Sequence, residues 1–263
     1  MLHGGPGFYG YMNSLGKRLP QHQEATYFPQ RGTLANPKPL DDLSLEAHLR
    51  DIDAQIGKFP HDRDICIIGH SWGANLALLY AAHNPGKLTK VVALAPAPLT
   101  MESAQKFESN LNQRMSPADR ARSDELELKI RSAFESGTFD ETSQELANER
   151  LNLAVPYYHY DKDITGQLTP VRVDFQSFIA SQNGLWKQIS NGTIPQCFKN
   201  ISVPTLLIQG VDDPIPYREV AENLKNYLPK LQHSRFNKCG HFPWLEPASK
   251  VECVAAIVQF LDG

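Results

Sequence analysis

The stretch that decides the fold is DICIIGHSWG, residues 64–73. Its first half is β-branched and apolar, which is typical of a buried strand, and an apolar helical pattern follows from Ala74 to Ala81. Ser71 therefore lies between two glycines at a predicted strand-to-helix turn. The glycines allow a turn so tight that the serine is exposed at its apex, and the N–H of Trp72 is free to bind a developing oxyanion. We predict that Ser71 is a nucleophile, the alternative being an ordinary glycine-bounded turn.

Composition bounds the class of protein. The chain has 263 residues, which fits one α/β domain with an insertion better than two independent domains. Its formal net charge is −3 with no long run of one sign, which argues against nucleic acid or an anionic membrane as a partner. No apolar stretch approaches the ~18–20 residues of a membrane span. Four scattered cysteines and no signal-peptide pattern favour a reduced, cytoplasmic setting.

Predicted strands alternate with predicted helices along most of the chain. Apolar runs predict strands at residues 25–28, 64–68, 91–95 and 203–208, and residues 231–236 predict a fifth strand that is more exposed and nearer a sheet edge. Amphipathic or apolar periodicity predicts helices that begin at Ser44, Ser71 and Pro247. This alternation predicts a doubly wound, mostly parallel sheet with helices on both faces.

The middle of the chain has a different character. Residues 99–198 are polar, helical in composition and poor in strand signals, so we predict a helical cap inserted between core segments 1–98 and 199–263. An aromatic cluster at 157–160 and the isolated Trp186 are too apolar for an open helical surface. We expect Tyr158 and Trp186 to bind substrate near Ser71, the alternative being that they only join cap to core.

A serine nucleophile needs a base to take its proton and an acid to orient that base. In the hydrolase order the acid comes next and the histidine last. Asp213 follows the predicted strand at 203–208, and His241 follows the strand at 231–236. Since the carboxyl ends of parallel strands share one edge, all three side chains are predicted to meet there. Taken alone, Asp213 could be a turn residue and His241 a surface histidine.

A glycine-rich loop near the N-terminus supplies the remaining part of the predicted site, a backbone donor for the oxyanion. Residues 2–7 read LHGGPG, and such a loop lets a backbone N–H approach a substrate carbonyl closely. Pro6 has no N–H, so the donor is Gly4 or Gly5. We favour Gly5, paired with the Trp72 N–H as an oxyanion hole, and expect His3 to brace the loop by hydrogen bonding.

These motifs together resemble the α/β-hydrolase superfamily, and most closely its proline iminopeptidase-like branch. They run from residue 2 to residue 246 and leave out only the insertion. The motifs are His3-Gly4-Gly5-Pro6-Gly7, Gln30-Arg31-Gly32, Gly69-His70-Ser71-Trp72-Gly73, Gly210-x-x-Asp213 and Gly240-His241-Phe242-Pro243. The resemblance implies a core sheet with a helical cap, no cofactor, and a Ser71–Asp213–His241 triad in which Asp213 rather than Asp212 is the acid.

Three departures from that branch matter. His70 precedes the serine, as in many esterases of the superfamily, where many branch members have glycine. The cap lacks the Trp-x-x-Trp-Glu stretch whose glutamate binds a substrate amine; Glu149 is the candidate substitute, although a solvated helix charge is the simpler interpretation. Finally, the resemblance places two strands and most of a third before His3, where only two residues stand. We therefore expect that the first strands are missing and that the natural product extends about 20–30 residues upstream to complete the sheet, the alternative being a fold that closes the sheet without them.

The residues therefore predict a cytoplasmic serine hydrolase that cleaves a small ester or an N-terminal amide, acting on a small molecule or short peptide. The alternatives are a carboxylesterase or carbon–carbon bond hydrolase with the same triad, or a non-catalytic protein of hydrolase-like fold. No His-Glu-x-x-His or paired Cys-x-x-Cys motif predicts a metal site. The sequence makes no prediction of oligomeric state.

Overall fold

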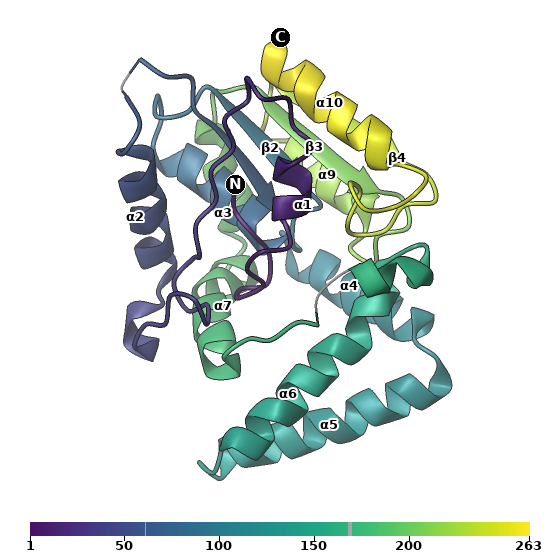
Figure 1. The fold of residues 1–263 in the computed structure, drawn as a ribbon. Coiled ribbons are helices and arrows are strands. Elements are labelled where there is room, and N and C mark those ends of the chain that lie inside the picture. Colours follow the sequence, from purple (N-terminus) through teal and green to yellow (C-terminus); the bar gives the residue numbers. More distant parts are fainter. Residues whose placement is uncertain (61, 168–169) are drawn as a thin grey trace.

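A computed structural model describes residues 1–60, 62–167 and 170–263. The predicted parallel sheet is confirmed. Its strands lie in the order β1-β2-β3-β4, and each pairs in parallel with its neighbour (Figure 1). The strands are β1 (Cys66–His70), β2 (Lys90–Leu94), β3 (Thr205–Gly210) and β4 (Leu231–Phe236).

Apolar side chains alternate between the two faces of this sheet, so helices cover both. Val91 and Ala93 of β2 belong to one core cluster, with helices α2 (Leu45–Ile56), α3 (Trp72–His83) and α9 (Tyr217–Lys225). Val92 and Leu94 belong to a second cluster, with the short helix α1 (Asn13–Gly16) and with α10 (Lys250–Asp262). The period of two along a strand thus produces the doubly wound arrangement.

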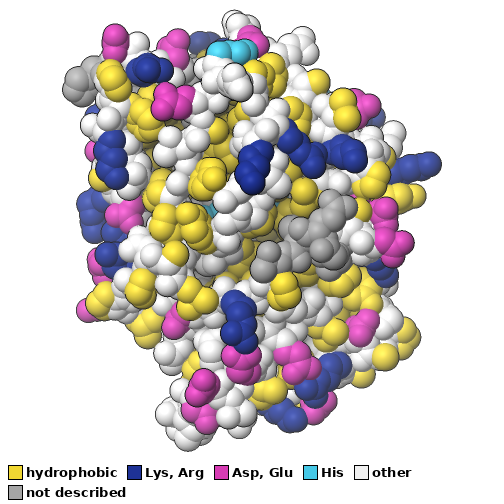
Figure 2. All heavy atoms as spheres, viewed as in Figure 1, with side chains coloured by type: hydrophobic (Ala, Val, Ile, Leu, Met, Phe, Trp, Pro, Cys, Tyr) yellow, Lys and Arg dark blue, Asp and Glu magenta, His cyan; other side chains and the backbone are white. Residues whose placement is uncertain are grey.

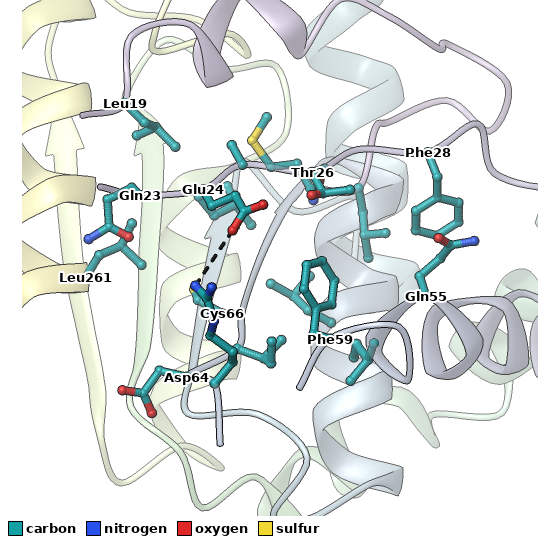
Figure 3. Close-up of a pocket in the computed structure, with 18 of the residues that line it drawn as sticks. Leu19, Gln23, Glu24, Thr26, Phe28, Gln55, Phe59, Asp64, Cys66 and Leu261 are labelled. Atoms are coloured by element: carbon teal, nitrogen blue, oxygen red, sulfur yellow. Dashed lines mark hydrogen bonds and ion pairs between the residues drawn. The ribbon is translucent and has the colours of Figure 1, made fainter. Parts of the chain in front are cut away.

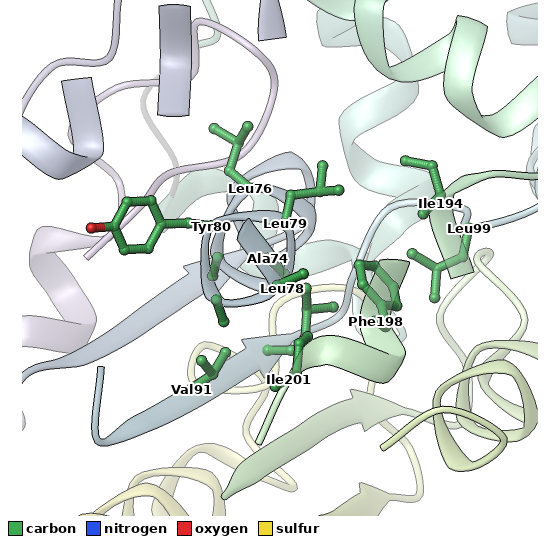
Figure 4. Close-up of a cluster of buried hydrophobic side chains, with 14 of the residues drawn as sticks. Ala74, Leu76, Leu78, Leu79, Tyr80, Val91, Leu99, Ile194, Phe198 and Ile201 are labelled. Carbon is green, nitrogen blue, oxygen red and sulfur yellow. The ribbon is translucent and has the colours of Figure 1, made fainter. Parts of the chain in front are cut away.

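Helix α3 is the centre of the first cluster. Every residue from Trp72 to Ala82 is buried, because the helix is apolar on all sides. Figure 4 shows Leu78 beside Phe198 and Ile201, which come from the segment just before β3. The residue that follows Ser71 therefore begins a helix enclosed by the protein.

Two predicted elements are wrong, for identifiable reasons. Residues 25–28 are not a strand, because a cavity separates them from β1 and no ladder forms with any described strand. The last helix begins at Lys250 rather than Pro247, since residues 244–249 form turns and Ser249 is the N-cap. The helix predicted from Ser44 is confirmed as α2, with the Ser44 side chain accepting a hydrogen bond from the N–H of Ala47.

The outer edge of β1 carries a short backbone contact and a cavity. The N–H of Leu2 donates to the Ile68 carbonyl at 2.8 Å, and the N–H of His70 donates to the Leu2 carbonyl at 3.0 Å. Beyond this bridge a cavity of about 210 Å³ separates β1 from residues 22–28. Figure 3 shows Cys66 and Asp64 on one side of it and Thr26 and Phe28 on the other.

The insertion between β2 and β3 is helical. Its elements are α4 (Met101–Arg114), α5 (Pro117–Glu135), α6 (Glu141–Ala154), η2 (Val155–Tyr158), η3 (Lys162–Gln167), α7 (Phe175–Ser190), α8 (Ile194–Cys197) and η4 (Phe198–Asn200). Figure 1 shows α5 and α6 side by side, projecting from the sheet layers. By contrast, Leu185 and Ile189 of α7 join the core cluster around α3. The last third of the cap is thus packed into the core.

The outside of the protein is of mixed character. The visible face carries both acidic and basic side chains with apolar ones between them (Figure 2). All four cysteines are unpaired. Within the described part of the chain, no helix combines the length and apolar content needed to cross a bilayer.

The enclosure of α3 leads to a stability prediction. We expect Leu79→Ala to lower the free energy of unfolding by about 2–5 kcal/mol, because Leu79 is fully buried and its truncation leaves a cavity. The matched control is Leu128→Ala on α5, where the leucine is 66% exposed and the change should stay within about 0.5 kcal/mol. Urea denaturation of both variants measures the difference, and equal losses would contradict the central role of α3.

A second prediction concerns acid stability. His48 of α2 is buried with its ring at 5.5 Å and 80° to that of Trp72, and burial lowers the pKa of His48 to about 3. Between about pH 6.5 and pH 3 the unfolded chain therefore holds a proton that the folded chain lacks. Stability should fall as the pH drops through this window, by up to about 1.4 kcal/mol per pH unit from this one group.

The measurement is urea denaturation at several pH values for the native chain and for His48→Leu. The variant should show a shallower dependence on pH in this window, because the group that takes up the proton on unfolding is gone. An unchanged slope would mean that His48 is charged in the folded protein.

Candidate active site

The turn between β1 and α3 places Ser71 in a strained backbone conformation. Ser71 has φ 54° and ψ −121°, which is rare for a residue with a side chain. Two glycines make the turn possible. A Cβ atom on Gly69 would lie 2.2 Å from the Gly73 carbonyl oxygen, and one on Gly73 would lie 2.3 Å from that of Leu2. Side chains at either position would push the turn apart.

The loops after β3 and β4 bring Asp213 and His241 together. His241 Nδ1 lies 2.8 Å from Asp213 Oδ2, and both side chains are buried. The other carboxylate oxygen of Asp213 accepts the N–H of Ile215 at 2.9 Å, and the Gln209 amide donates to Oδ2 at 3.2 Å. The adjacent Asp212 instead accepts the N–H of Cys239. The carboxylate that faces His241 is therefore that of Asp213.

Ser71 and His241 line the same cavity, of about 160 Å³, beneath the cap. Among the described residues the Ser71 hydroxyl has no hydrogen-bond partner. Catalytic serine–histidine contacts often close only when substrate is bound, so this geometry is compatible with a nucleophile and base. The structure thus brings all three predicted side chains to one edge of the sheet, as the order of the loops implied.

The glycine-rich loop lies against the serine turn. A Cβ atom on Gly4 would lie 3.0 Å from Ser71 Cβ, so only glycine allows this approach. The N–H of Gly4 donates to Tyr11 Oη at 2.7 Å and is therefore occupied. In the described part of the chain no acceptor meets the N–H of Gly5 or that of Trp72. Of the two predicted donor choices, Gly5 is thus the one left available.

His3 holds this loop from the other side, as expected. Its ring Nε2 accepts the N–H of Gln30 at 3.3 Å, and its Nδ1 lies 2.9 Å from the Gly4 carbonyl. Burial lowers the pKa of His3 to about 4, so the ring is neutral at pH 7 and its proton resides on Nδ1. Because the carbonyl and the next N–H of a trans peptide point in opposite directions, fixing the Gly4 carbonyl also fixes the direction of the Gly5 N–H.

The cap supplies most of the cavity wall. Tyr158 and Trp186 both line the cavity, and the Tyr158 ring centroid lies 5.3 Å from that of His241. Trp186 is 38% exposed, so it reaches both cavity and solvent, and it donates to Gln182 Oε1 at 3.1 Å. No Asp, Glu, Lys or Arg from the described residues lines this cavity. The polar side chains of this cavity wall lie around Ser71, with the amide of Gln182 in addition.

The structure does not bring Glu149 to the cavity. Glu149 is exposed on α6 and accepts two hydrogen bonds from Arg122, at 2.8 and 3.0 Å. It is absent from the cavity lining. Its surroundings are those of a solvated helix charge in an ion pair.

Sequence reasoning missed the residues that fasten the cap to the loops that carry Asp213 and His241. Arg114 of α4 donates to the Asp212 carbonyl and, at 2.7 Å, to the His159 carbonyl. The fully buried Glu246 accepts the N–H of Gly240 at 3.1 Å and that of Tyr160 at 2.8 Å. Arg114 and Glu246 look like surface charges in a sequence, because nothing in their spacing indicates that their partners are distant backbone groups.

Comparison with known proteins agrees with this architecture. A family model described as "alpha/beta hydrolase fold" matches residues 1–248. The chain is 25% identical over 281 residues to a proline iminopeptidase of Heyndrickxia coagulans, covering 100% of this chain and 90% of that protein. It is 24% identical over 268 residues to monoacylglycerol lipase ABHD6 of Bos taurus, covering 99% of this chain and 74% of that protein. The crystal structure of VinJ has a TM-score of 0.68 at 17% identity, covering 99% of this chain and 88% of that one.

The family match spans nearly the whole chain and agrees with the parallel sheet, the helical insertion and the serine turn described above. The resemblance that the sequence motifs indicated is therefore confirmed, and the protein belongs to the α/β-hydrolase fold family.

Proposed function

We propose that the protein is a serine hydrolase that cleaves esters of small, uncharged carboxylic acids. Ser71 is the nucleophile, His241 the base and then the acid, and Asp213 the carboxylate that orients His241. The N–H groups of Gly5 and Trp72 form the oxyanion hole. The observation that carries the proposal is the buried 2.8 Å contact between His241 and Asp213, with His241 and the strained Ser71 in the wall of one cavity.

The chemistry follows from these positions. Ser71 Oγ attacks the ester carbonyl carbon while His241 Nε2 takes the serine proton. Asp213 accepts from Nδ1 and stabilises the imidazolium that forms, and the two N–H groups bind the carbonyl oxygen as it becomes negative. Collapse expels the alcohol, which takes its proton from His241. Water then cleaves the acyl-enzyme by the same steps.

The character of the cavity narrows the substrate class. Recognition of a free α-amine requires an anionic or strongly polar partner, because burying an unpaired charge is unfavourable. No charged side chain of the described residues lines the cavity, and Glu149 pairs with Arg122 elsewhere. The apolar wall that includes Tyr158 and Trp186 fits an uncharged acyl group. This favours an ester over the N-terminal amide of a peptide, although one of the relatives is a proline iminopeptidase.

A panel of p-nitrophenyl esters and aminoacyl-naphthylamides tests the proposal. Hydrolysis of short-chain esters with little cleavage of the arylamides is the expected result. Faster cleavage of the arylamides than of the esters would instead favour an aminopeptidase. A protein that cleaves neither and does not react with a fluorophosphonate probe would be a non-catalytic member of the fold.

The triad assignment predicts a specific order of variant activities. We expect Ser71→Ala to abolish probe labelling and to lower kcat by on the order of 10⁶-fold, and Asp213→Asn to lower kcat by on the order of 10⁴-fold. Asp212→Asn is the matched control, since its side chain bonds to Cys239 rather than to His241. Steady-state kinetics on one ester compares all three, and a larger loss in Asp212→Asn would show that the acid has been misassigned.

The cap assignment predicts a change of selectivity. Trp186→Ala enlarges the cavity, so the ratio of kcat/KM for a longer over a shorter acyl chain should rise, by about tenfold or more for one or two methylenes. The melting temperature should change little, because Trp186 is partly exposed.

Glu149→Gln serves as its control and should alter neither selectivity nor arylamide cleavage. Loss of arylamide cleavage alone in Glu149→Gln would instead indicate that this glutamate binds a substrate amine. A lower melting temperature with unchanged selectivity in Trp186→Ala would mean that Trp186 only joins cap to core.

A further inference from the structure

One imidazole outside the triad belongs to the serine turn and contacts two further segments at the candidate site. His70 precedes Ser71, and its Nε2 lies 2.8 Å from the carbonyl oxygen of His241. Its Nδ1 lies 2.5 Å from Tyr11 Oη, which in turn accepts the N–H of Gly4 at 2.7 Å. A continuous chain of hydrogen bonds therefore runs from the glycine-rich loop, through the residue beside Ser71, to the backbone of His241.

The direction of each bond follows from counting protons. His70 is fully buried, and this burial, with the nearby His241, lowers the pKa of His70 well below its usual range, so the ring is neutral. A neutral imidazole has one N–H, and a carbonyl can only accept, so the proton resides on Nε2. Nδ1 must then accept the hydroxyl hydrogen of Tyr11, and the Tyr11 oxygen accepts the N–H of Gly4. Burial raises the pKa of Tyr11, which keeps that hydroxyl protonated.

Aromatic packing leaves the two rings little freedom. The Tyr11 ring lies 5.5 Å from that of His70 at 76°, and it stacks on Trp244 at 6.1 Å. The His70 ring lies 4.9 Å from each of Phe242 and Trp244. A ring flip or change of tautomer in His70 would break hydrogen bonds at both ends of this hydrogen-bond chain. The hydrogen-bond chain is therefore a rigid spacer between two loops.

We propose that Tyr11 and His70 are positioning residues that set the Gly4–Gly5 loop and the His241 loop relative to Ser71. This inference rests on the proposed function, since it assigns these loops to the oxyanion and the base. Both residues keep their protons, so they act through Gly4 and His241 and take no part in proton transfer. Their effect is on geometry, where misplacement of about 1 Å can lower a rate by on the order of 10²-fold.

The first experiment is Tyr11→Phe, which removes only the hydroxyl. We expect kcat per fluorophosphonate-titrated active site to fall by about 10- to 100-fold with KM within about twofold, because ester binding in the apolar cavity is retained. Tyr9→Phe, two residues away on the same loop and 41% exposed, is the matched control and should be neutral. An unchanged kcat in Tyr11→Phe overturns the proposal.

The second experiment separates coupling from general damage. In His70→Gln the side-chain amide N–H can still reach the His241 carbonyl but cannot accept from Tyr11, whereas His70→Asn offers an acceptor to Tyr11 without reaching His241. Both should lower kcat. The double variant Tyr11→Phe/His70→Gln should lose no more activity than the weaker of its parents, because the same bond is broken in each. Losses that multiply would show that Tyr11 does not act through His70.

A third measurement does not depend on activity. Long-range ¹H–¹⁵N spectra of His70 should show a neutral ring protonated on Nε2 from about pH 5 to pH 8. A ring protonated on Nδ1, or a charged ring, overturns the proposal whatever the kinetics show. Failure of the native chain to react with the fluorophosphonate probe would overturn the proposed function instead, so the two failures are distinguishable.

Discussion

The contact between the backbone of residues 2–3 and Gly73 is the constraint on which the site depends. A Cβ atom at Gly73 would meet the carbonyl oxygens of Leu2 and His3 at 2.3 and 2.6 Å, so the two segments touch main chain to main chain. This approach brings Gly4 against Ser71 and leaves the N–H of Gly5 free beside it. It also closes the only bridge on the outer edge of β1 in the described sheet. The hydrophobic enclosure of α3 holds Gly73 in place, so the core and the site are stabilised together.

Buried neutral histidines are the second recurring element around the serine turn. His3 and His70 each use one ring nitrogen as donor and the other as acceptor. His3 fixes the Gly4 carbonyl directly, and His70 fixes the Gly4 N–H through Tyr11. Burial removes the charge from both rings, so their hydrogen-bonding pattern is constant at neutral pH. His241 differs because its Nδ1 faces a buried carboxylate. Of these three histidines, His241 alone has a carboxylate as the partner of Nδ1 among the described residues, which is the arrangement that the proposed base requires.

Much of this arrangement could be predicted from the sequence. The predictions that fail do so for physical reasons. Ser71 and Asp213 follow apolar strands and His241 follows a more exposed one, so their meeting at one edge depends only on parallel topology. Residues 25–28 have strand-like composition but no neighbouring strand, and composition alone cannot reveal a missing partner. Glu149 and Glu246 look alike in sequence, yet one forms a surface ion pair and the other is buried under backbone N–H groups. That difference is created by long-range packing.

The attachment of the cap has a consequence for how ligands reach the cavity. The N–H of His241 donates to the Tyr158 carbonyl at 2.7 Å, and a Cβ atom at Gly240 would lie 2.2 Å from the same oxygen. Lifting the cap at η2 would therefore displace His241 and leave both loops with unsatisfied polar groups. Entry is easier past a partly exposed side chain such as Trp186. Exchange of ligands would then follow the nanosecond rotation of single side chains rather than the slower hinge motion of a whole lid.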